Sequence, residues 1–176
     1  THFMQGSCGK MCGLDLPGDD MDPTLLCDDC IMHPKPWDAG CAAMMYDGSA
    51  RQMVLGLKHA DRHDLVAPLA KWMTEAVRST LPRNAIVVPI PLHWRRLLKR
   101  KYNQSALLAQ RIAKLSKAEV CVDGLKRIRH TPSLDGATMA ERGDILDNAI
   151  IVTPRRAACL KARNVVLVDD VMTSGA

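Results

Sequence analysis

The stretch that most constrains the fold is residues 164–176, which read NVVLVDDVMTSGA. Its four consecutive aliphatic residues, 165–168, predict a β-strand buried on both faces, because a strand with one solvated face would alternate apolar and polar residues. Asp169 and Asp170 follow where this strand ends. In open α/β sheets, ligands bind outside the carboxyl ends of the strands, next to the N-terminus of the following helix. The stretch therefore predicts an α/β sheet with a ligand site at this edge.

The residue types that follow the acids indicate the class of ligand. A short turn carries two hydroxyl groups and a glycine, and such a turn lets the backbone wrap closely around a phosphate. Acids directly before this turn suit ribose hydroxyls or a bound Mg²⁺. An ordinary buried strand ending in an acidic turn is the competing interpretation, but it leaves the turn unexplained. We therefore predict a sugar-phosphate site at the turn formed by Thr173, Ser174 and Gly175.

Composition narrows the class of protein. The 176 residues are 47% hydrophobic and 24% charged, which is typical of a globular protein with one main domain and a small appendage. No apolar run approaches the roughly 20 residues needed to cross a bilayer, so we expect no membrane insertion. The net charge of +5 suits phosphorylated ligands or nucleic acid without distinguishing them. Seven cysteines, most of them near the start, favour metal binding in a reducing compartment, so we expect a cytoplasmic protein.

The early cysteines fall into two close pairs separated by a polar loop: Cys8 with Cys12, and Cys27 with Cys30. Two such pairs can close a tetrahedral, structural Zn²⁺ site, and the metal would supply the stability that a loop with few apolar residues lacks. Cys41 is a substitute ligand, and incidental unpaired cysteines are the competing interpretation. A proline-rich connector follows. We therefore expect a zinc-ribbon-like module at 1–37, a main domain at 38–176, and a first strand of that domain at 41–46.

A second strand–turn–helix unit lies in the middle of the chain. Residues 85–90 predict a buried strand, and prolines fix the backbone where it ends. Five cationic side chains follow within 95–101, and Asn103 then opens a helix that extends to about residue 116. A solvated charge run is the alternative interpretation. Because the basic segment follows the carboxyl end of a strand, we expect an anion to face Pro89, Pro91, Leu92, His93, Arg95 and Arg96.

Several stretches resemble known families. Residues 166–176, VLVDDVMTSGA, resemble the phosphoribosyl-pyrophosphate (PRPP) signature of type I phosphoribosyltransferases. The stretches at 46–48 (YDG), 57–59 (LKH), 88–93 (VPIPLH) and 100–105 (RKYNQS) are similar to the ComF family of competence-associated proteins. Those proteins join a cysteine-rich zinc module to a type I phosphoribosyltransferase domain, in the order seen here. The family usually has glycine where this chain has Lys101.

The resemblance implies an α/β fold of the type I phosphoribosyltransferase kind, with a parallel sheet flanked by helices. It implies that PRPP binds with Mg²⁺ and that its 5′-phosphate lies on Thr173, Ser174, Gly175 and Ala176. It also implies that Asp169 and Asp170 contact the ribose as catalytic acids, and that residues 89–96 face the pyrophosphate that is released. A mobile lid would carry Arg127, Arg129, Thr131 and Arg142. The family signature usually continues with Thr and a helix, so we expect a C-terminus truncated at Ala176.

The resemblance also leaves a second function open. The protein could be a non-catalytic adaptor that binds PRPP or a nucleotide in DNA uptake or DNA processing. Single-stranded DNA and competence or DNA-processing proteins are the partners expected in that case.

Overall fold

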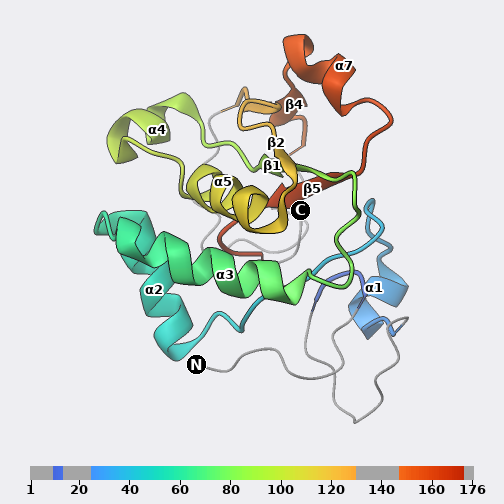
Figure 1. Ribbon diagram of the computed structural model, residues 1–176, viewed down its shortest axis with the longest axis horizontal. Coiled ribbons are helices and arrows are strands. Elements are labelled where there is room, and N and C mark those ends of the chain that lie inside the picture. The colour runs from blue at the N-terminus through green and yellow to red at the C-terminus, as the bar shows by residue number, and fades with distance from the viewer. Residues whose placement is uncertain (1–9, 14–24, 130–146, 173–176) are drawn as a thin grey trace.

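The computed structural model of the chain describes residues 10–13, 25–129 and 147–172. At its centre is a three-stranded sheet in which both pairs of neighbours run parallel. The strands, in order across the sheet, are β2 (Glu119–Val120), β1 (Ile86–Pro89) and β5 (Val165–Val168). The predicted parallel α/β sheet is therefore confirmed, with β1 in the middle of the three strands (Figure 1).

Helices and a second, antiparallel pair of strands surround this sheet. In chain order they are α1 (Asp28–Met32), α2 (Gly48–His59), the 3₁₀ turn η1 (His63–Leu65), α3 (Val66–Ala76), α4 (Trp94–Arg100), α5 (Gln104–Ser116), β3 (Leu125–Arg127), β4 (Ile150–Val152), the 3₁₀ turn η2 (Pro154–Arg156) and α7 (Ala157–Leu160). Among the described residues, none of these helices combines the length and apolar character needed to span a bilayer.

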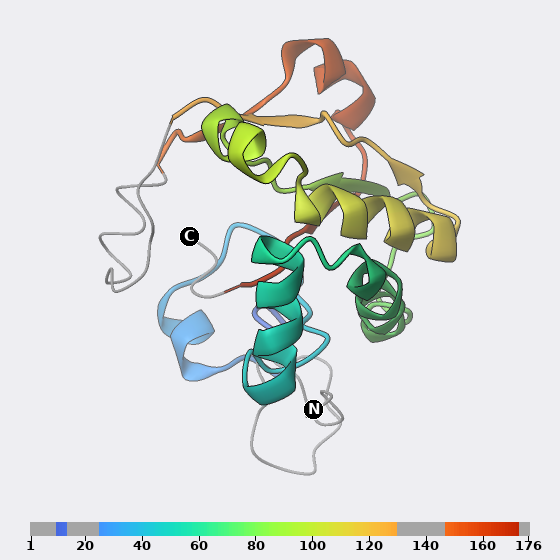
Figure 2. The same cartoon turned by 90° about the vertical axis from the view of Figure 1, so that its left-hand side faces the viewer.

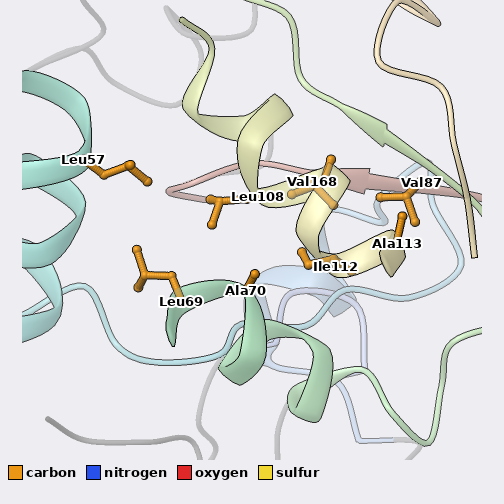
Figure 3. Packing of buried hydrophobic residues seen from close by; sticks show 9 residues of the cluster. Leu57, Leu69, Ala70, Val87, Leu108, Ile112, Ala113 and Val168 are labelled. Carbon is orange, nitrogen blue, oxygen red and sulfur yellow. The ribbon is translucent and has the colours of Figure 1, made fainter. Parts of the chain in front are cut away.

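Helix α5 holds the main core together. Asn103 caps its N-terminus, since the Asn103 side chain accepts a hydrogen bond from the Ser105 N–H at 3.0 Å, as the sequence predicts. The buried side of α5 packs against the sheet and against α3, and α2 adds one fully buried leucine (Figure 3). The buried residues of this core are Leu57, Leu69, Ala70, Val87, Leu108, Ala109, Ile112, Ala113 and Val168.

Strand β1 is buried on both faces, which confirms the prediction for residues 85–90. Val87 points into the core beneath α5, whereas Ile86 and Val88 join a smaller cluster with Cys121 on the opposite face. Leu125 and Leu160 pack against that smaller cluster. A strand covered on both sides needs no polar alternation, which explains its continuous apolar sequence.

Two predictions about strands are wrong. Strand β5 is not buried on both faces, because Val165 is 41% exposed and Leu167 is 56% exposed, while Val168 is buried. In the described part of the chain, β5 pairs with β1 alone, and the face that carries Val165 and Leu167 stays open to solvent. Residues 41–46 form only an isolated bridge at Met44, because this apolar stretch packs beside the cysteine segment and the core instead of pairing as a strand.

Lys101 stands where the ComF proteins that the sequence resembles usually have glycine, and its backbone conformation favours glycine. Lys101 ends α4 with φ 65° and ψ −14°, a left-handed conformation that L-residues adopt at a cost. Lys117 ends α5 in the same way, with φ 58° and ψ 28°.

We expect Lys101→Gly to raise the free energy of unfolding by about 0.5–1 kcal/mol, since glycine relieves the left-handed strain. Urea denaturation followed by circular dichroism measures this change. Lys117→Gly is the matched variant and should give a similar gain. Lys99→Gly, inside α4, should instead lower stability by about 1 kcal/mol. A loss of stability in Lys101→Gly would contradict the left-handed backbone at this position.

Candidate functional site

Three elements meet at the acidic pair that follows β5. Ser105 at the start of α5 donates its hydroxyl hydrogen to Asp169 Oδ1 at 2.8 Å, and the backbone N–H of Asp170 donates to the same oxygen at 2.9 Å. Lys58 of α2 places its Nζ 3.2 Å from Asp170 Oδ2. Both carboxylates are therefore held by groups from distant parts of the sequence.

Sequence reasoning did not assign Lys58 or Ser105 to the site. The one signal that could have found them is that both lie in short stretches similar to the ComF family, 57–59 and 100–105. Apolar periodicity identifies the helices that carry them but not the partner that each side chain meets across the fold.

One oxygen of the pair is poorly satisfied. The side chain of Asp170 is 5% exposed, and no donor among the described residues is aligned to hydrogen-bond its Oδ2, although Lys58 lies at ion-pair distance. A buried carboxylate oxygen without a hydrogen bond lowers stability, and a ligand or cation that reached this oxygen would remove that cost. Carboxylate oxygens are the ligands that Mg²⁺ prefers, so this donor set fits Mg²⁺ or a sugar hydroxyl.

Asp169 titrates at an unusually high pH. Burial of the carboxyl group among protein atoms, followed by the negative charge of Asp170, raises the pKa of Asp169 to about 6, although the residue stays partly exposed to solvent. The hydrogen bond from Ser105 and the charge of Lys58 act in the opposite direction. Near neutral pH, Asp169 is thus an acid whose charge state is sensitive to its neighbours.

The turn after β1 lies directly beside the acids. The Ile90 N–H donates to the Val168 carbonyl at 2.9 Å, so residues 90–93 begin next to Asp169. Asn103 donates its side-chain N–H to the Ile90 carbonyl at 3.0 Å. Arg127 of β3 donates its Nε–H to the Pro91 carbonyl at 3.1 Å. The turn is therefore fixed from two sides, by α5 and by β3.

Two guanidinium groups approach this edge. Arg127 is half-buried, and its pKa is lowered first by burial and then by the charge of Arg96, while Asp169 raises it. Arg96, Arg127 and Asp169 are therefore close enough to interact electrostatically. The structure brings together one predicted loop residue, one predicted lid residue and one predicted acid, and their charges suit a ligand that carries phosphate groups and hydroxyls.

The other predicted loop residues differ in environment. His93 is buried and caps α4, because its Nδ1 accepts from the Arg95 N–H at 3.4 Å, so its side chain has a structural role. Arg95 is exposed and lies 5.3 Å from the centre of the Trp94 ring. Pro89 is buried, Pro91 and Leu92 are half-buried, and Arg129 is exposed. The remaining predicted site residues lie outside the described part of the chain: Cys8, Thr131, Arg142, Thr173, Ser174, Gly175 and Ala176.

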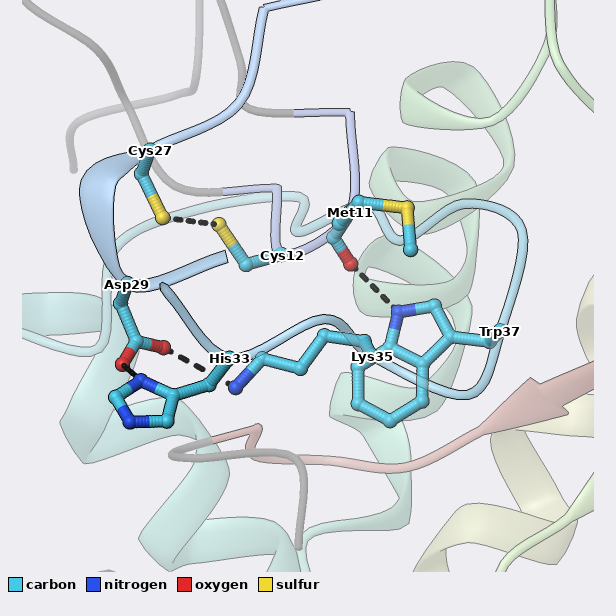
Figure 4. A network of polar contacts seen from close by, with 7 residues as sticks. All are labelled: Met11, Cys12, Cys27, Asp29, His33, Lys35 and Trp37. Carbon is cyan, nitrogen blue, oxygen red and sulfur yellow. Dashed lines mark hydrogen bonds and ion pairs between the residues drawn. The ribbon is translucent and has the colours of Figure 1, made fainter. Parts of the chain in front are cut away.

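A second candidate site is the group of three cysteines near the N-terminus. The sulfur atoms of Cys12, Cys27 and Cys30 all lie within 4.8 Å of one another. Those of Cys12 and Cys27, which Figure 4 shows pointing toward each other, are 3.5 Å apart. Cys27 precedes α1 and Cys30 lies within it, which places both sulfurs on the same side. Three converging thiols can hold a metal ion, and thiolate ligands suit Zn²⁺.

Close backbone packing fixes the shape of this segment. A Cβ at Gly13, where φ is 65°, would lie 2.6 Å from the Ala42 nitrogen. Trp37 donates its indole N–H to the Met11 carbonyl at 2.6 Å (Figure 4). The alternative ligand Cys41 is not part of the group of three cysteines, and its thiol donates instead to the Ala76 carbonyl of α3 at 3.3 Å.

The raised pKa of Asp169 predicts a pH-dependent stability difference. Between about pH 4 and pH 6, Asp169 holds a proton in the native state that it has released in the unfolded chain. The contribution of Asp169 to the free energy of unfolding therefore falls as pH rises through this window. Asp169→Asn has no such proton. We expect its stability relative to wild type to increase from about pH 4 to pH 6 and then level off, measured by urea unfolding at each pH.

Asp123→Asn is the matched control for this pH series. Arg156 hydrogen-bonds Asp123 and lowers the pKa of its carboxyl group, so ionised Asp123 stabilises the native state above its unfolded pKa. That variant should lose stability at neutral pH, opposite in sign to Asp169→Asn. A stability difference for Asp169→Asn that does not change with pH would show that Asp169 titrates normally.

Comparison with known proteins identifies relatives over most of the chain. The chain is 31% identical to DNA utilization protein YhgH of Salmonella typhi over 158 residues, which cover 87% of this chain and 68% of that protein. It is 26% identical to competence protein F of Haemophilus influenzae over 154 residues, covering 85% of the chain and 67% of the relative. No family model and no solved structure matches the chain. The chain belongs to the family of these two proteins, the ComF family.

Proposed function

We propose that this protein acts in competence or DNA utilization, the roles named for its relatives, and that it binds PRPP with Mg²⁺ at the acidic edge of its sheet. The observation that carries the proposed ligand is the Asp169–Asp170 pair with its buried, poorly satisfied oxygen, at the carboxyl end of a parallel strand. Arg96 of α4 and Arg127 of β3 lie near this edge, and they supply positive charge for phosphates.

Each residue of this edge has a definite task in the proposed site. Asp169 and Asp170 would hold the ribose hydroxyls and the metal, while Ser105 and Lys58 orient the two carboxylates. Arg96 and Arg127 would face the pyrophosphate. Bound Mg²⁺ would neutralise charge on the pyrophosphate as it leaves. Phosphoribosyl transfer of this kind depends on positioning and electrostatics, so it requires no nucleophilic side chain.

We assign the group of three cysteines to structural Zn²⁺. Cys12, Cys27 and Cys30 supply three thiolates, and Cys8 is the fourth ligand by its spacing in the sequence. A closed site with four thiolates stabilises a small module instead of reacting with substrate. The division of the chain at residue 37 is part of this proposal.

Calorimetric titration of PRPP with Mg²⁺ tests the proposed ligand. We expect saturable binding to wild type and binding at least about tenfold weaker in Asp170→Asn, a loss of about 1.4 kcal/mol, because the amide removes a charge from the metal and hydroxyl ligands. Asp64→Asn is the control, since Asp64 is exposed and pairs with Arg62 on the surface. Metal analysis of the same samples should find one Zn²⁺ per chain.

The two failures of this titration are distinguishable. Equal affinity for PRPP in wild type and Asp170→Asn would show that PRPP binds elsewhere on the protein. No saturable binding to folded protein that contains zinc would rule out PRPP as the ligand and would favour the adaptor function.

The adaptor function is the second candidate, and the surface of α4 favours it. This helix places its apolar side outward: Trp94 is 58% exposed and Leu98 is 72% exposed. Its half-buried residues are instead Arg96 and Arg100. Four of its seven residues are cationic and none is acidic. An exposed aromatic ring among cations is the combination that binds single-stranded nucleic acid, through base stacking and phosphate contacts.

For this second candidate we expect Trp94→Ala to weaken binding of a fluorescent single-stranded oligonucleotide about tenfold, measured by fluorescence anisotropy. The wild-type affinity should fall steeply with salt, because phosphate contacts release counterions. Met32→Ala, which removes an exposed apolar side chain from α1, should leave the affinity unchanged. An oligonucleotide affinity that changes neither with salt nor in Trp94→Ala would exclude α4 as a nucleic-acid surface.

A further inference from the structure

Two cysteines outside the candidate metal site lie together on the face of the sheet opposite α5. Cys121 directly follows β2 and is 7% exposed, and Cys159 lies in α7 and is exposed. Leu160, the residue after Cys159, packs against the buried cluster of Ile86, Val88 and Cys121. Residues from two distant parts of the chain are thereby brought into one cluster.

Both thiols border the same ionic group. Cys121 Sγ lies 3.8 Å from Asp123 Oδ1, and the Cys159 thiol donates to the Arg156 carbonyl at 3.0 Å. Asp123 in turn accepts from Arg156 Nε at 2.9 Å and from Arg155 Nη2 at 2.8 Å. Burial raises the pKa of the Cys121 thiol, and the neighbouring Cys159 thiol raises it further.

We infer that Cys121 and Cys159 form a reversible dithiol–disulfide pair that reacts with small-molecule disulfides such as glutathione disulfide. Three observations support this inference. Leu160, next to Cys159, packs against the cluster that contains Cys121. Both thiols border the Asp123–Arg156 ion pair, and one thiol is buried while the other is exposed. This reactive pair is independent of PRPP, of Mg²⁺ and of the cysteines near the N-terminus.

The exchange proceeds in two balanced steps. The exposed Cys159 thiolate attacks one sulfur of glutathione disulfide, so a Cys159–glutathione bond forms, the glutathione S–S bond breaks and one glutathione thiolate leaves. The Cys121 thiolate then attacks the Cys159 sulfur, and the second glutathione leaves. Two protein thiols lose their protons and are oxidised to one disulfide, while one glutathione disulfide is reduced to two thiols. The positive charge of Arg156 lowers the pKa of Cys121 and so offsets part of the effect of burial on that thiol.

The position of the pair gives the disulfide a structural effect. Cys121 and Cys159 bracket residues 122–158, the segment that contains β3 and β4. Arg127 of that segment holds the turn after β1 through the Pro91 carbonyl. A disulfide between Cys121 and Cys159 would join the two ends of this segment into a covalent loop. The oxidation state of the pair would therefore control how far the ends of the segment can separate.

The test is oxidation of the zinc-loaded protein with glutathione disulfide, followed by proteolysis and mass spectrometry of the peptides. We expect a cross-linked peptide that joins Cys121 to Cys159, and its loss on treatment with dithiothreitol. The oxidised protein should melt roughly 5–10 °C higher than the reduced protein, because the closed loop lowers the entropy of the unfolded chain.

Variants separate this pair from the other cysteines. Cys159→Ser should abolish the cross-link and the rise in melting temperature, whereas Cys41→Ser, at another exposed cysteine, should retain both. Cys121→Ala should leave a stable glutathione adduct on Cys159. The inference is overturned if wild-type Cys159 keeps its glutathione while Cys121 stays reduced, or if the cross-link joins either residue to a cysteine near the N-terminus.

Discussion

The parallel pairing of β1 with β5 is the contact on which the candidate site depends. Its register sets Pro89 opposite Val168, so the turn after β1 and the acids after β5 leave the sheet at the same edge. The Ile90 N–H extends the ladder by one bond to the Val168 carbonyl. Val87 and Val168 then form the surface on which α5 packs, and the start of α5 brings Ser105 to Asp169. A shift in this register would separate the acids from the turn and from α5 together. Figure 2 shows α5 lying between β1 and α3, the two elements that it packs against.

Charge compensation at this edge is incomplete. Two adjacent carboxylates repel each other, and Lys58 offsets part of that repulsion from α2. Burial, together with the remaining repulsion, raises the pKa of Asp169, and no donor among the described residues is aligned to the buried Asp170 Oδ2. Carboxylates whose charge is only partly compensated in the free protein bind a cation or hydroxyl hydrogens most favourably. The free-energy cost of their repulsion is already present in the folded protein, and the ligand relieves it.

The parts of the fold that could be predicted from the sequence are those set by local patterns. The buried β1, the cap at Asn103 and the acids at a strand end follow from apolar runs and residue types that act within a few positions. Lys58 could not be found in this way, because its partner Asp170 is far along the chain and a lysine on a helix resembles any solvated cation. The exposure of Val165 and Leu167 was missed because an apolar run records the residue types of a strand, not what covers each face.

The cysteines illustrate why spacing alone does not decide chemistry. Cys12, Cys27 and Cys30 lie outside the two buried apolar clusters of the described residues, and a metal bound by these thiols would supply the stability that such a cluster supplies elsewhere. Cys121 and Cys159 lie at the margin of a formed core, too far apart in sequence for any spacing rule to pair them. Burial disfavours the thiolate of Cys121, which protects it from direct attack on solutes, while exposure leaves Cys159 to react first. Which of the two thiols reacts first thus follows from their positions in the fold, and it cannot be deduced from the number of cysteines.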